Sequence, residues 1–144
     1  MLSNLSRALV YLSAVLFALL GTPLFVAPAA LSPVFAWKVS PFVTMTIGAW
    51  CLGNAWLGWV TARRWQSRLV YSALIYLWLF GAFELAVVMA FRGKVVLAHP
   101  IAWLYVGTLL VNLVAAFAGL IEWTVNNGIE SPQIIGLNCP LIIA

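Results

Sequence analysis

The sequence predicts an all-α integral membrane protein, a bundle of four transmembrane helices joined by short loops. Two features of its composition predict this class: 65% of the 144 residues are hydrophobic, and only 7% are charged. A soluble domain carries roughly 25% charged residues, so this chain could not cover its surface in water. The third observation is that the apolar residues form long runs without the period-two alternation of a β-barrel strand. In lipid such runs are expected to be helices, which satisfy their own backbone hydrogen bonds.

The predicted spans follow from where polar residues and prolines interrupt the apolar runs, at about 20 residues per crossing. The spans cover residues 5–25, 42–60, 69–91 and 100–123, followed by a C-terminal tail over 124–144. This length leaves no room for a separate soluble domain. We therefore interpret residues 1–144 as a single membrane domain.

The first run could be a secretory signal peptide, but its apolar stretch is long for one, which favours a retained span. Pro23 removes one backbone donor, so it is expected to kink or end this helix. Three prolines make a regular helix through 28–41 unfavourable. Phe35 and Trp37 in that loop suggest that it lies along the membrane interface. Pro100 opens the fourth span, a position where proline is tolerated.

The basic residues predict the orientation, because cytoplasmic loops carry an excess of lysine and arginine. With the N-terminus inside, the inner residues are Arg7, Arg63, Arg64 and Arg68, and the outer ones are Lys38, Arg92 and Lys94. We therefore expect a multi-pass protein of a bacterial plasma membrane with both termini cytoplasmic. These cations are expected to contact phospholipids, and they are too dispersed to favour nucleic-acid binding.

Glu84 is the most informative residue, because it lies inside the third span, eight positions before Arg92. A bare carboxylate at that depth is costly, so it must be protonated, paired or facing a cavity. The structural interpretation is a carboxyl group bonded to Asn54 or Asn112 on a neighbouring span. The functional interpretation is a proton relay or a polar anchor for a bound molecule, with all three residues forming one buried polar cluster.

Small residues mark the expected close contacts between helices. On the second span they are Gly48, Ala49, Gly53, Ala55 and Gly58, and on the fourth they are Thr108, Ala115, Ala116 and Gly119. Such faces let helix backbones approach closely, and they could also make room for a flat ligand.

Four residues are candidates for binding a cofactor. His99 is the only histidine and could ligate a haem or chlorin metal, although a capping role at the start of the fourth span is the simpler interpretation. Trp50, Trp56 and Trp78 fall within spans and could line a site for a quinone, carotenoid or chlorin at a subunit interface. Cys51 and Cys139 belong to no CxxC motif and are interpreted as apolar thiols. No dedicated metal site is predicted.

No nucleophile–base, metalloprotease, phosphate-binding or dinucleotide motif is present, so we expect no catalytic residues and no enzyme. The favoured function is a non-catalytic accessory subunit of a larger membrane complex, for example a respiratory or photosynthetic electron-transport assembly. Its partners would be other integral membrane subunits, and it would seal interfaces or help to hold lipid, quinone or pigment. The alternative is a small oligomeric transporter or channel that uses Glu84 as a proton- or ligand-responsive group.

Overall fold

The computed structural model describes residues 4–65 and 69–127 of the chain. Within these residues it contains five α-helices, two 3₁₀ turns and no β-strand. In chain order they are α1 (Asn4–Val26), α2 (Pro28–Leu31), η1 (Ser32–Val34), α3 (Pro41–Arg63), α4 (Leu69–Ala90), η2 (Arg92–Lys94) and α5 (Pro100–Asn127). The predicted all-α class is confirmed for this part of the chain. The organisation as a single domain stays a prediction.

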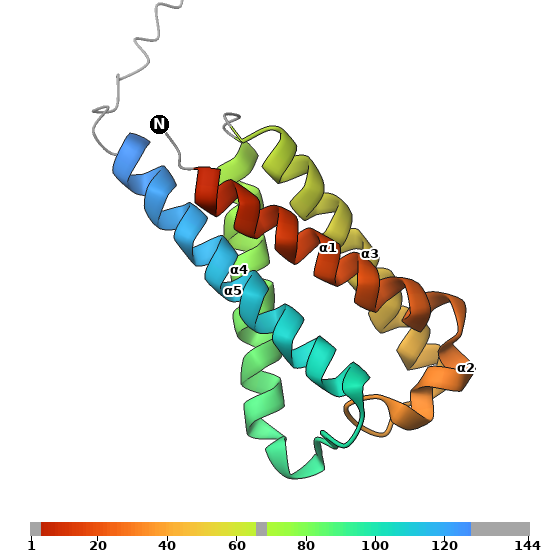
Figure 1. Cartoon of the computed structure of the whole chain (residues 1–144). Helices are drawn as coiled ribbons and strands as arrows, with labels where there is room; N and C mark the ends of the chain where they lie inside the picture. The colour runs from red at the N-terminus through yellow and green to blue at the C-terminus, as the bar shows by residue number, and fades with distance from the viewer. Residues whose placement is uncertain (1–3, 66–68, 128–144) are drawn as a thin grey trace, which may run out of the picture.

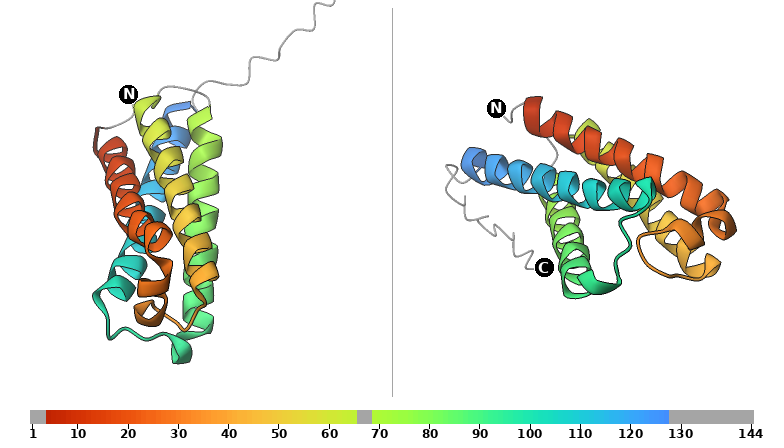
Figure 2. Two further views of the ribbon diagram at one scale, coloured as in Figure 1. Left: turned by 90° about the vertical axis from the view of Figure 1, so that its right-hand side faces the viewer. Right: turned by 60° about the horizontal axis from the view of Figure 1, so that its bottom comes forward.

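The four long helices run alternately up and down, so that α1 begins and α5 ends at the same end of the bundle (Figure 1). The short helix α2 and the α4–α5 connection lie at the opposite end (Figure 1). Helix α1 packs mainly on α3 and also on α5, and α5 packs on α4, whereas α3 and α4 make few contacts. Figure 2 shows the same arrangement from two other directions. The bundle is therefore closed on three sides and open between α3 and α4.

Three helices are long and apolar enough to cross a membrane, namely α1, α4 and residues Pro100–Val125 of α5. The predicted second span forms the 23-residue helix α3, but α3 is not among these three. Its sequence contains Asn54, Thr44 and Thr61, all of which are buried against other helices. These polar groups lower the mean hydropathy of α3, which is the property that identifies a membrane span. Four crossings are thus not confirmed, although three are supported.

The first connection differs from the predicted irregular interfacial loop, because it contains α2 and η1. Pro28 occupies the first turn of α2, where its missing N–H costs no hydrogen bond. Phe35 is only 2% exposed and packs in the core. The place of this connection along the membrane interface stays a prediction. The backbone of Val96 donates a 2.6 Å hydrogen bond to the Ala36 carbonyl, which ties the two connections together over this end of the bundle.

Pro23 does not end the first helix, since α1 continues through it to Val26. The Pro23 carbonyl accepts a 2.9 Å hydrogen bond from the Ala27 amide, as in a regular helix. Proline removes only its own N–H, so the turn that follows it can still form.

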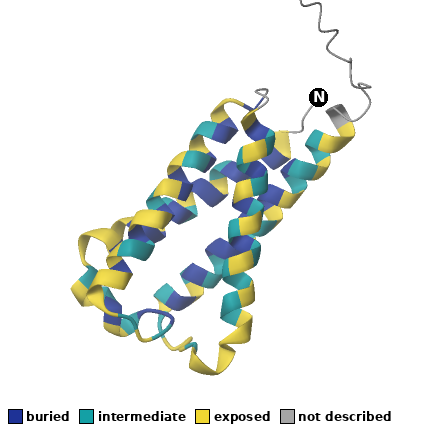
Figure 3. Cartoon of the chain, turned by 180° about the vertical axis from the view of Figure 1, so that it is seen from behind, coloured by how far each residue is buried: buried dark blue, intermediate teal, exposed yellow. Residues whose placement is uncertain are grey.

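Buried residues form two clusters along the bundle, and Figure 3 shows them on the inward faces of the long helices. The larger cluster lies toward the two connections and includes Phe17, Leu20, Phe35, Tyr105 and Leu109. The smaller one lies toward the other end of the bundle and includes Val10, Trp65, Val70, Leu74 and Ala115. The outward faces remain largely exposed, as expected for helices that meet lipid.

Among the described residues, α1 and α3 make the most extensive contact between two helices. A Cβ atom added at Gly48 would lie 2.6 Å from the Phe25 amide nitrogen, and one added at Gly21 would lie 2.9 Å from the Gly48 carbonyl oxygen. Glycine is therefore required where these two backbones meet. At the end near the N-terminus, Arg7 Nε donates a 2.8 Å hydrogen bond to the Ala62 carbonyl near the end of α3.

Candidate functional site

A partly enclosed cleft of about 250 Å³ lies where α3 and α4 separate. All four long helices contribute to its wall. Most lining side chains are apolar and several are aromatic: Phe17, Trp37, Val43, Ile47, Trp50, Cys51, Phe80, Val87 and Leu109. Glu84 and Tyr105 are the remaining two lining residues. The cleft thus combines a mostly apolar wall with a carboxyl group and a phenol.

Glu84 and Tyr105 are bonded directly to each other. The Tyr105 hydroxyl donates a 2.8 Å hydrogen bond to Glu84 Oε2. Tyr105 is 4% exposed, and its ring packs edge-on against Phe35 and Trp37 at centroid distances of 5.3 and 5.4 Å. Glu84 itself is half-buried. The phenol is therefore held in place by aromatic packing, while the carboxyl group keeps an accessible side toward the cleft.

A second hollow of about 510 Å³ adjoins the cleft at the end of α4. It is lined by Trp37, Lys38, Val87, Phe91 and Lys94, and it shares Trp37 and Val87 with the cleft. The Lys94 ammonium lies 5.8 Å from the centre of the Phe91 ring. Two cations beside aromatic side chains are typical of the headgroup layer, where lysine attracts anionic phospholipids.

The predicted cluster of Glu84, Asn54 and Asn112 does not form as one bonded group. Asn112, 1% exposed, donates a 2.8 Å hydrogen bond to the Leu77 carbonyl and accepts a 3.1 Å bond from the Ser13 hydroxyl. It therefore links α5 to both α4 and α1. The expectation that Glu84 bonds to Asn54 or Asn112 is wrong, because its partner is Tyr105.

Asn54 is buried on α3 at 3% exposure, and its Nδ2 atom has no hydrogen-bond partner among the described residues. It does not line the cleft. A buried amide donor in this position needs an acceptor that the described chain does not supply.

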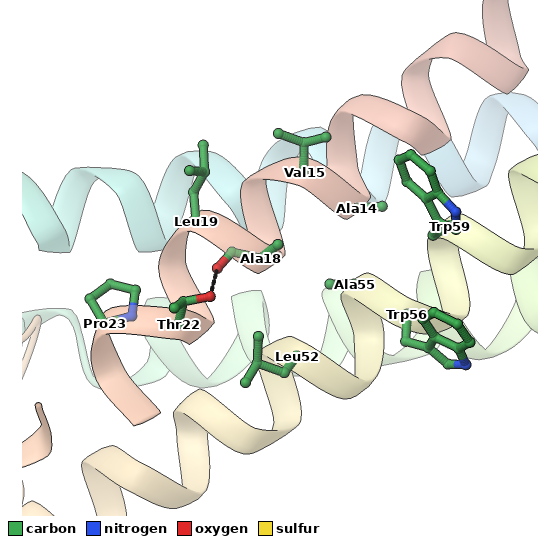
Figure 4. Close-up of a pocket in the computed structure, with 10 residues that line it drawn as sticks. All are labelled: Ala14, Val15, Ala18, Leu19, Thr22, Pro23, Leu52, Ala55, Trp56 and Trp59. Carbon is green, nitrogen blue, oxygen red and sulfur yellow. Dashed lines mark hydrogen bonds between the residues drawn. The ribbon is translucent and has the colours of Figure 1, made fainter. Parts of the chain in front are cut away.

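The three candidate tryptophans lie on three different surfaces. Trp50 lines the Glu84 cleft and is 57% exposed. Trp56 lines an apolar groove of about 640 Å³ between α1 and α3, shown in Figure 4 with Trp59 on the same helix. Trp78 lines a shallow hollow on the outer side of α4. They do not converge on one ligand site, so the cleft contains only one of them.

The remaining candidates lie apart from the cleft. His99 precedes α5, where its carbonyl accepts a 3.1 Å hydrogen bond from the Ala102 amide, as a residue at a helix start does. Within the described ranges, no three His, Cys, Asp or Glu side chains are grouped so as to hold a metal ion. Cys51 is a free, buried thiol on the cleft wall. Cys139 lies outside the described residues.

Sequence reasoning missed Tyr105, which the structure makes the partner of Glu84. The sequence contains one signal for this pairing, because Glu84 and Tyr105 lie almost equally far from the connection between α4 and α5. Glu84 lies six residues before α4 ends at Ala90, and Tyr105 lies five residues after α5 begins at Pro100. In two antiparallel helices joined by a short connection, positions equally far from that connection lie at the same height.

The geometry describes a polar pair in an apolar cleft that opens sideways between two helices, with cations near its outer end. Such an arrangement can bind and orient a molecule that dissolves in the membrane. In comparisons with known proteins, no family model, no curated protein and no solved structure matches this chain.

Proposed function

We propose that the chain is a non-catalytic accessory subunit of a larger membrane complex and that it holds an apolar or amphipathic molecule in the Glu84 cleft. The observation that carries the proposal is the bonded Glu84–Tyr105 pair on the wall of an otherwise apolar cleft. Pockets for small ligands are typically apolar, with a few placed polar groups that fix orientation. A polar side chain in a membrane helix is expensive, which favours a functional reason for its presence.

The opening between α3 and α4 supports lateral entry from the bilayer. These two helices make few contacts, and Trp50 on α3 is 57% exposed at the cleft. Lys38 and Lys94 line the adjoining hollow, where they would meet phospholipid headgroups. A molecule with an apolar tail could therefore enter without crossing the tightly packed α1–α3 contact.

The exposed face of α4 supports assembly with other membrane subunits. Only 17% of its most apolar stretch is buried within the chain, against 39% for α1 and for α5. Its outward side chains include Tyr76, Leu79 and Phe83, each at least half exposed. A helix of a partner subunit could pack there without disturbing the bundle.

The alternative function, a small transporter or channel, would require a continuous polar path. Instead, Asn112 forms hydrogen bonds that join α5 to α1 and α4, and Glu84 is bonded to Tyr105. These contacts favour a role in holding a molecule over a role in conducting one.

The test is to purify the full chain from its native membranes in mild detergent, then to record subunit composition, absorption spectrum and extracted small molecules together. The proposal expects other membrane subunits in fixed ratio and a retained apolar molecule. Glu84→Leu should lose that molecule while keeping the partner subunits. Leu110→Ala is the control, because Leu110 on α5 is exposed, follows the cleft residue Leu109 and does not itself line the cleft. A self-contained oligomer that retains nothing and shows proton-coupled transport would refute the proposal.

A further inference from the structure

We propose that the ligand of the Glu84 cleft is a membrane-soluble aromatic alcohol with a flexible apolar chain, of the chemical class of a reduced isoprenoid quinone. This inference rests on the proposed holding function and specifies its ligand. Three features of the cleft carry it: the direction of its hydrogen bond, the aromatic character and size of its wall, and its opening toward lipid.

The hydrogen bond between Tyr105 and Glu84 leaves the pair with acceptors to offer. The Tyr105 hydrogen is used on Glu84 Oε2, at 2.8 Å. The second carboxyl oxygen and the phenol oxygen can then accept. Because a polar atom facing an apolar space needs a partner, the complementary ligand group is an O–H donor. A hydroquinone offers such a donor, whereas its oxidised quinone offers only carbonyl acceptors.

The wall of the cleft suits a single flat ring. Phe17, Trp37, Trp50 and Phe80 surround the polar pair with aromatic side chains, which pack well against another ring edge-to-face or offset-stacked. The volume of about 250 Å³ lies below the roughly 300–1,000 Å³ of pockets for drug-sized ligands. One ring therefore fits, while a chlorin macrocycle would exceed the space.

The position of the cleft leaves an exit for a long chain. Glu84 lies six residues, or about 9 Å along the axis, before the end of α4. A ring at this height would sit below the headgroup layer marked by Lys38 and Lys94. Its apolar chain would leave through the gap between α3 and α4, where contacts are few.

The experiment measures retention of three radiolabelled probes by the full chain in phosphatidylcholine nanodiscs, with empty nanodiscs subtracted to remove simple partitioning. The probes are a decyl-substituted hydroquinone, its oxidised quinone and its dimethyl ether, which have the same ring and chain. Saturable binding of the hydroquinone is expected. The ether, which lacks both O–H donors, should bind about tenfold more weakly, as should the quinone, because one hydrogen bond to the polar pair is lost.

Two variants test the polar pair, and one serves as control. Glu84→Leu and Tyr105→Phe should each weaken hydroquinone binding by about tenfold or more. Tyr105→Phe keeps the ring that packs on Phe35 and Trp37, so it reports on the hydroxyl even if Glu84→Leu fails to fold. Leu110→Ala, an exposed position on α5 outside the cleft, should bind as the unaltered chain does.

Equal binding of the hydroquinone and its ether, or unchanged binding in Tyr105→Phe, would overturn the inference. Recovery of a molecule without an O–H donor from the native complex would also overturn it, while the proposed holding function would stand. If the chain purifies from native membranes with neither ligand nor partner subunits, the proposed function fails as well. The two levels of the proposal are thus tested by different results.

Discussion

The two sides of α3 illustrate two opposite solutions to helix packing in one molecule. Toward α1, glycine faces glycine, and Gly48 leaves its backbone within reach of Phe25 and Gly21. Toward α4, the larger side chains Trp50 and Ile47 face Phe80 and Glu84 across the cleft. Lipid tails are as apolar as the helices, so association in a membrane depends on close fit and on hydrogen bonds. The side of α3 that carries small residues therefore packs closely on α1. The side that carries large residues leaves the cleft between α3 and α4.

This difference assigns different roles to the two sides. The α1–α3 contact supplies stability, because any added atom there meets backbone that cannot move aside. The α3–α4 side contains the proposed site, whose polar pair is held by the packing of the Tyr105 ring on Phe35 and Trp37. Three substitutions test this division, beginning with the one that should cost most.

Gly48→Ala should produce the largest effect, a loss of about 2–3 kcal/mol in the free energy of unfolding, as expected for overpacking against rigid neighbours. The added Cβ would lie 2.6 Å from the Phe25 nitrogen. Unfolding in mixed detergent micelles, followed by circular dichroism, measures it. Gly53→Ala is the matched control on the same helix, because nothing lies within 4 Å of its added Cβ. Equal destabilisation by both substitutions would contradict the assignment of the tight contact.

Asn112→Leu should cost less, about 1 kcal/mol, because interhelical hydrogen bonds in membranes contribute about 0.6 kcal/mol on average. The change removes the bonds to the Leu77 carbonyl and the Ser13 hydroxyl. The same unfolding assay applies. The double substitution with Ser13→Ala should cost less than the sum of the single ones, since both remove one shared bond. Strict additivity would show that the Ser13 contact contributes nothing.

Val87→Phe should have the smallest effect on stability, well under 1 kcal/mol, because the added ring enters open space in the cleft rather than a packed contact. Ligand retention should nevertheless be lost completely, since the ring would occupy the cleft that Trp37 and Glu84 also line. Unfolding and extraction of bound molecules are measured on the same preparation. A variant that is stable and still retains its ligand would place the site elsewhere.

Much of the secondary structure follows from the sequence. The four predicted runs lie within, or within a residue of, the helices Asn4–Val26, Pro41–Arg63, Leu69–Ala90 and Pro100–Asn127. Apolar length and the positions of proline and charge are local properties, so they predict helices without knowledge of the fold. The secondary-structure prediction was least accurate in the first connection, where tertiary contacts determine the local structure. The connection before α3 contains α2 and η1 and buries Phe35, whose ring packs on Trp37 and Tyr105.

The candidate site was predicted in part. Glu84 and Trp50 were identified as polar and aromatic candidates, and both line the cleft. Tyr105 was overlooked, because tyrosine in an apolar run is common and its partner lies 21 residues earlier in the chain. Asn54 and Asn112 were grouped with Glu84 because all three lie within apolar runs. Depth in a helix does not specify the direction in which a side chain points.

The sequence by itself determined that the chain is helical and suited to lipid, and it singled out the costly carboxylate at Glu84. The tertiary structure alone decided which helix faces meet, and therefore that Tyr105 bonds to Glu84 while Asn112 joins α1, α4 and α5. The physical reason is that every face of a membrane helix is apolar, so composition does not separate a face that meets lipid from one that meets another helix. Only the tertiary fit, with no side chain at Gly48 and a large one at Trp50, separates a sealed contact from an open cleft.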